Sequence, residues 1–69
     1  MKAEEVVLVA AVGASAGAVS RKLGLTTGNS AFDAVIGLAI AGIGWFMDYD
    51  GAGDFIEGYG VGYLFDSVL

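Results

Sequence analysis

The chain has 69 residues, of which 57% are hydrophobic and only 16% are charged, whereas about a quarter of an average soluble domain is charged. A soluble chain of this size would bury only about 60% of the surface that it exposes when unfolded, so much of its apolar material would have to face water. The composition therefore favours a single membrane-embedded domain covering residues 1–69.

Charge and residue content also exclude several classes of function. Eight acids oppose three bases, which gives a net charge of −5, and nucleic-acid binding needs clustered Lys and Arg. The chain has no His and no Cys, so it lacks the usual ligands of zinc, haem and iron–sulfur clusters and has no imidazole to activate a serine. We therefore expect no direct nucleic-acid partner, no metal, no cofactor and no enzymatic activity.

The first apolar run covers residues 6–20, after Glu4 and Glu5 and before Arg21 and Lys22. Acids at the start of a helix and bases at its end suit the helix dipole, so this segment predicts a helix at about 4–21. A secretory signal peptide is the alternative, because residues 14–16 (ASA) resemble a small-residue cleavage site. The two glutamates, in place of a positive excess, weigh against that alternative.

Residues 22–30 have the composition of a turn, with Gly24, Gly28 and Asn29 beside hydroxyl residues. The second apolar run then predicts a helix at about 31–48. It ends in the aromatic pair Trp45 and Phe46, and a Trp at the edge of an apolar run is typical of a bilayer interface. Trp45 is therefore a predicted interface anchor.

Asp33 is a carboxylate at the beginning of this second apolar run. A charged residue inside a membrane segment is costly and often functional, for example in a proton or ion relay. Asp33 lies only three positions after Ser30, however, so a favourable charge in the first turn of a helix is the preferred explanation.

An acidic loop is expected at residues 48–54 (DYDGAGD). It begins like a calcium-binding loop, but Ala52 stands at position five and Glu57 at position ten, which departs from the EF-hand pattern. A solvated turn is favoured over a weak cation site within residues 48–57.

The last segment predicts a helix at about 55–67, with Tyr59 and Tyr63 as interface anchors at headgroup level. The alternation of glycine with larger residues at positions 58–63 is also compatible with a strand. A helix is favoured because an isolated strand in or near lipid leaves backbone groups without hydrogen bonds.

Small residues recur at spacings of three, four and three in the first two predicted helices, which places each set on one helix face. These two small-residue columns are predicted to be helix-packing residues, because small side chains allow close backbone approach in lipid. Since a short turn joins the two helices, they are expected to form an antiparallel hairpin. The columns are Ala10, Gly13, Gly17 and Ser20, and Ala34, Gly37, Ala41 and Gly44.

The sequence thus predicts an all-α fold: a small integral-membrane helical hairpin followed by a short aromatic helix. The expected function is that of a structural, non-catalytic protein that packs side by side in a cell or virion membrane, with lipid and other copies of itself as partners. An accessory transmembrane subunit of a larger membrane enzyme complex is the alternative, and a small oligomeric ion channel is the third hypothesis. The tendency of basic loops to stay inside favours the Arg21–Lys22 turn on the inner side.

Overall fold

The computed structural model describes residues 2–47 and 51–69. Across these residues it contains three helices and no strand: α1 (Ala3–Lys22), α2 (Ser30–Phe46) and α3 (Ala52–Val68). The all-helical prediction is confirmed, and the strand alternative for the last segment is wrong. By length and composition, α1 is the one helix in these residues that is long and apolar enough to cross a membrane.

Local interactions explain where the first two helices begin and end. Glu4 and Glu5 lie in the first turn of α1 and two bases lie in its last turn, which is the arrangement that the helix dipole favours. The side chain of Asn29 caps α2 by accepting hydrogen bonds from the amides of Ala31 (2.9 Å) and Phe32 (3.3 Å). In the connecting turn, Gly24 has a φ of 111°, a backbone conformation that favours glycine.

The last helix begins earlier than predicted, at Ala52. Gly51 precedes it with a φ of 83°, and the Asp54 carboxylate accepts a hydrogen bond of 3.4 Å from the Gly51 amide. The acidic residues of the expected loop are therefore divided. Asp54 belongs to the first turn of α3, whereas residues 48–50 lie outside the described residues.

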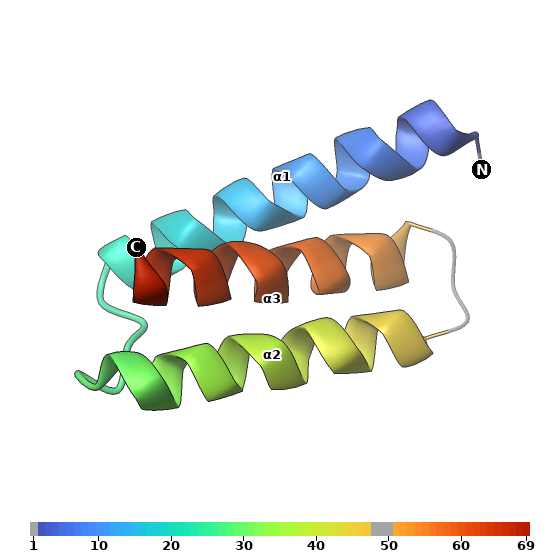
Figure 1. Cartoon of the computed structure of the whole chain (residues 1–69). Coiled ribbons are helices and arrows are strands. Elements are labelled where there is room, and N and C mark those ends of the chain that lie inside the picture. The colour runs from blue at the N-terminus through green and yellow to red at the C-terminus, as the bar shows by residue number, and fades with distance from the viewer. Residues whose placement is uncertain (1, 48–50) are drawn as a thin grey trace.

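The third helix lies between the other two, as Figure 1 shows. It packs on both α1 and α2, whereas the backbones of α1 and α2 do not approach each other. The chain direction in Figure 1 makes α3 parallel to α1 and antiparallel to α2. The structure therefore does not confirm a hairpin in which the first two helices pack together, because α3 takes the position that each was expected to fill for the other.

Small residues lie inside the molecule and large apolar residues lie outside. Five of the six residues buried in α3 are either glycine or serine, and the sixth is Tyr63. Asp33 is buried in α2, with glycines as the other buried residues of that helix. The outer surface carries large side chains that are at least half exposed, among them Val7, Leu8, Val12, Phe32, Val35, Leu38, Ile43, Trp45, Phe46 and Phe65.

Candidate functional site

The small-residue column of α1 packs on the backbone of α3. A Cβ atom added at Gly13 would overlap the carbonyl oxygen of Phe55, and one added at Gly17 would overlap the carbonyl oxygen of Tyr59. Backbone atoms cannot rotate out of the way as a side chain does. Glycine is therefore required at both positions for the two helices to lie this close together.

The facing side of α3 carries a glycine pair of its own. A Cβ atom at Gly58 would overlap the carbonyl oxygen of Ala10, and one at Gly62 would overlap that of Ala14. Both helices thus present small residues four positions apart. The α1–α3 contact is a backbone-to-backbone packing of the GxxxG type.

The column of α2 packs on the opposite side of α3. A Cβ atom at Gly37 would lie 2.7 Å from the Leu64 amide nitrogen and 2.8 Å from the Gly60 carbonyl oxygen. In return, a Cβ atom at Gly60 would overlap the Ala41 amide nitrogen. This second contact runs antiparallel. Helix α3 thus carries glycines on two sides, and each of these sides packs on a different helix.

Gly44, at the far end of the second column, also packs on α3. A Cβ atom at Gly44 would overlap the Glu57 amide nitrogen, and one at Gly53 would lie 2.9 Å from the Gly44 carbonyl oxygen. Ser20 and Ala34, the two column members nearest the turn, are half-buried. The prediction that the two columns contact each other directly is therefore wrong. Each column packs on α3 instead of on the other column.

A cluster of polar side chains ties the helices together at the turn end of the molecule. Its centre is Asp33, which has no exposed surface. The carboxylate accepts hydrogen bonds from Arg21 Nε (3.0 Å), from the amide (2.9 Å) and hydroxyl (2.8 Å) of Thr27, and from the hydroxyl of Thr26. The Tyr63 hydroxyl lies 3.4 Å from the same carboxylate.

The cluster extends from Asp33 to the end of α3 through the two bases of α1. Arg21 Nη1 donates to both the carboxylate and the backbone carbonyl of Asp66, each at 3.1 Å, and Lys22 Nζ lies 2.7 Å from the other carboxylate oxygen. Arg21 therefore bridges α2 and α3. We call Arg21, Lys22, Thr26, Thr27, Asp33, Tyr63 and Asp66 the polar cluster.

Hydrogen bonds and opposite charges keep both acids of the polar cluster ionised. The Thr26 hydroxyl, the amide and hydroxyl of Thr27 and the Arg21 guanidinium hold the pKa of Asp33 well below its usual range, although burial opposes this shift. Lys22 and Arg21 lower the pKa of Asp66 in the same way. With two bases and two acids, the cluster is neutral as a whole.

Asp33 was predicted to lie in the first turn of a helix, and it does. Its burial and its bonds to Arg21 and Tyr63 were not predicted. Arg21 and Tyr63 are 12 and 30 positions away along the chain, and no local spacing indicates such a contact. In the sequence, only the position of Asp33 within an apolar run indicated an unusual environment for this acid.

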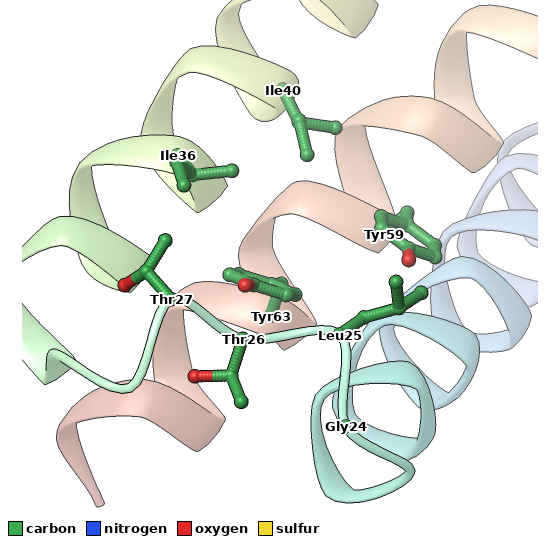
Figure 2. Close-up of a pocket in the computed structure, with 8 residues that line it drawn as sticks. All are labelled: Gly24, Leu25, Thr26, Thr27, Ile36, Ile40, Tyr59 and Tyr63. Carbon is green, nitrogen blue, oxygen red and sulfur yellow. The ribbon is translucent and has the colours of Figure 1, made fainter.

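An open groove of about 330 Å³ lies beside the polar cluster. Figure 2 shows the turn passing in front of Tyr63, with Ile36 and Ile40 of α2 on one side and Tyr59 on the other. The groove is lined by Gly24, Leu25, Thr26, Thr27, Ile36, Ile40, Tyr59 and Tyr63. Its lining is mainly apolar.

The three expected interface anchors have different surroundings. Trp45 is 73% exposed near the end of α2, and its ring lies 5.4 Å from that of Phe46. Tyr59 is half-buried and lines the groove. Tyr63 is only 5% exposed, so the expectation of an exposed anchor there needs correction: its hydroxyl faces Asp33 inside the molecule.

The buried polar side chains of the described residues form hydrogen bonds within the chain. Within residues 2–47 and 51–69, every buried side-chain nitrogen or oxygen has a hydrogen-bond partner, and no three acids lie close enough together to hold a metal ion. Comparisons with protein-family models, curated proteins and solved structures gave no match.

Proposed function

We propose that this chain is a structural, non-catalytic membrane protein that packs side by side with other copies of itself in a cell or virion membrane. The observation that carries the proposal is the distribution of residue sizes: glycines fill the interior, and large apolar side chains cover the outside. Water would oppose this distribution, since apolar surface is driven out of water. Lipid favours it, because helices associate there through close backbone packing.

The dimensions of the helices support the same environment. Helices of 20, 17 and 17 residues are about 30, 26 and 26 Å long, which is close to the hydrocarbon thickness of about 30 Å. In the proposed orientation the uncharged stretches 6–20, 34–46 and 58–65 lie in the hydrocarbon. They are about 22, 20 and 12 Å long, so the uncharged part of α3 is too short to cross it alone. The polar cluster then lies at one membrane surface.

The position of α1 in the bundle argues against a cleaved signal peptide. Gly13 and Gly17 are buried against the α3 backbone, so removal of α1 would uncover one glycine side of α3. Most of α1 is nevertheless exposed, with only 11% of its most apolar window buried. That low burial is unlike the core helix of a soluble protein.

Gly42 supports association between copies. A Cβ atom at this position would meet no other atom within 4 Å, so packing inside the chain gives no reason for glycine. Exposed Ala39 lies three positions before it and on the same side of α2. Close approach by a helix of a neighbouring copy would give Gly42 the role that Gly37 has inside the chain.

Two measurements test the proposal. Flotation of vesicles after alkaline extraction should recover the chain with the lipid, and mass analysis in mild detergent should give homo-oligomers. Gly42→Leu should reduce the oligomer while leaving the helical content unchanged, whereas Gly60→Leu should disrupt the fold itself. A freely dissolved monomer without detergent contradicts the membrane location, and a detergent-solubilised monomer at every concentration contradicts self-association.

The mass analysis also distinguishes the accessory-subunit alternative, which requires a fixed low ratio to foreign chains. The small oligomeric ion channel requires a small closed ring of copies in the same mass analysis. Its pore would have to lie between copies, because α3 occupies the space between α1 and α2 with close backbone packing at glycines.

A further inference from the structure

We infer that the groove beside the polar cluster holds one acyl chain of a membrane phospholipid. This inference rests on the proposed membrane location. In that location the part of the groove lined by Ile36 and Ile40 lies in the hydrocarbon, where no water is present to fill it. An empty groove would leave its lining without contacts on one side, and the loss of those dispersion contacts is unfavourable. Lipid chains are the molecules present there at the highest concentration.

The groove has the polarity gradient of a lipid. Its end nearest the membrane surface is formed by the turn residues Thr26 and Thr27, and its inner end is formed by Ile36 and Ile40. A phospholipid has the same order, with its ester groups near the surface and its methylene chain below. The hydroxyl oxygen of Tyr59 faces the groove in Figure 2 and offers a donor to an ester carbonyl.

Depth and volume fit one chain of one leaflet. Ile40 lies ten residues after the start of α2, which corresponds to about 15 Å along the helix. That depth is half of a hydrocarbon core of about 30 Å. The volume of about 330 Å³ is at the lower end of the range for small-molecule sites, about 300 to 1,000 Å³, and leaves room for one chain.

Charge does not contribute to the choice of lipid. The polar cluster contains two bases and two acids in direct contact, so the surface above the groove does not favour an anionic headgroup. Recognition therefore depends on the chain and on the ester group. Phosphatidylcholine and phosphatidylglycerol should occupy the groove equally well.

The test compares lipid retention by two matched tryptophan variants. Ile36→Trp fills the groove, whereas Leu38→Trp adds the same side chain to the same helix at a position that is 64% exposed on the outer surface. Each protein is reconstituted into vesicles of phosphatidylcholine or phosphatidylglycerol, extracted into mild detergent and weighed by native mass spectrometry. Wild type and Leu38→Trp should each retain one phospholipid per chain from either vesicle, and Ile36→Trp should lose it.

A second pair of variants provides the same test if a variant of the first pair does not fold. Ile40→Phe fills the deeper part of the groove, and Leu38→Phe is its control on the exposed surface. Far-UV circular dichroism checks the helical content of all four variants. Equal retention by filled and control variants, or a clear preference for one headgroup, overturns the inference. The inference is also overturned if the groove holds a second copy of the chain and Ile36→Trp displaces that copy. If the wild-type chain inserts into vesicles but retains no lipid, the groove inference alone fails, whereas failure to insert removes the proposed function.

Discussion

The contact between α2 and α3 can be tested by adding one methyl group. Gly37→Ala places a Cβ atom 2.7 Å from the Leu64 amide nitrogen, whereas an ordinary contact begins at 3.4 Å. The obstacle is backbone, so relief requires the two helices to separate by about 0.7 Å. Gly42→Ala is the matched control, because it makes the same change on the same helix where the added atom meets nothing within 4 Å.

The expected magnitude follows from two opposing effects. A separation of about 0.5–1 Å loses a quarter to a half of each dispersion contact across an interface, and overpacking costs about 1–3 kcal/mol. The upper end applies to Gly37→Ala because a backbone atom is in the way. Replacing glycine by alanine within a helix stabilises the helix by about 1 kcal/mol. The net expectation is a loss of about 2 kcal/mol for Gly37→Ala and a gain of about 1 kcal/mol for Gly42→Ala.

The assay is unfolding by sodium dodecyl sulfate in mixed micelles, followed by far-UV circular dichroism. The midpoint for Gly37→Ala should fall below that of wild type, and the midpoint for Gly42→Ala should equal or exceed it. If the two variants unfold at the same detergent fraction, the close approach at Gly37 does not stabilise the fold and the packing argument is refuted.

Three further predictions concern the polar cluster. Asp33→Asn should lower the unfolding midpoint in the same assay, because it removes the charge that holds Arg21 while leaving the guanidinium partly buried; a midpoint equal to that of wild type would contradict a stabilising role. Tyr63→Phe should change the midpoint much less, because its hydroxyl is 3.4 Å from the carboxylate, at the limit of a hydrogen bond; an effect as large as that of Asp33→Asn would show that the hydroxyl matters more than its distance suggests. Finally, the folded-state pKa values of Asp33 and Asp66 lie below the ordinary value of 3.8, so their stabilising effect is present above about pH 4 and is lost as the pH falls through the folded-state values. When the unfolding midpoint is measured from about pH 6 to about pH 2, it should therefore fall in wild type and fall less in Asp33→Asn. Parallel pH profiles of the two proteins would refute this assignment.

The positions of the glycines that pack could be read from the sequence, but their partner could not. Gly13, Gly17, Gly37 and Gly44 stand at spacings that a helix turns to one side, and all four are buried. A small-residue face, however, accepts any other small-residue face of suitable direction. The sequence therefore does not reveal that both columns meet α3 instead of each other.

The decisive feature is that α3 carries glycines on two sides. Gly58 and Gly62 are four positions apart and face α1, while Gly53 and Gly60 are seven positions apart and face α2. The second pair is harder to recognise in a sequence, since its members are two helical turns apart. The alternation of glycine with larger residues over this segment also resembles a strand pattern, which hides the two helical faces.

The sequence by itself determined the helical segments, their small faces and the excess of apolar residues, because these depend on local spacing and composition. Only the tertiary structure decided that the third helix separates the first two, that Asp33 is buried beside Arg21, and that Tyr59 and Tyr63 line a groove beneath the turn. These features join residues far apart in the chain, up to 45 positions for Arg21 and Asp66. Such contacts depend on which of several similar helix faces pack together, and local sequence pattern does not record that choice.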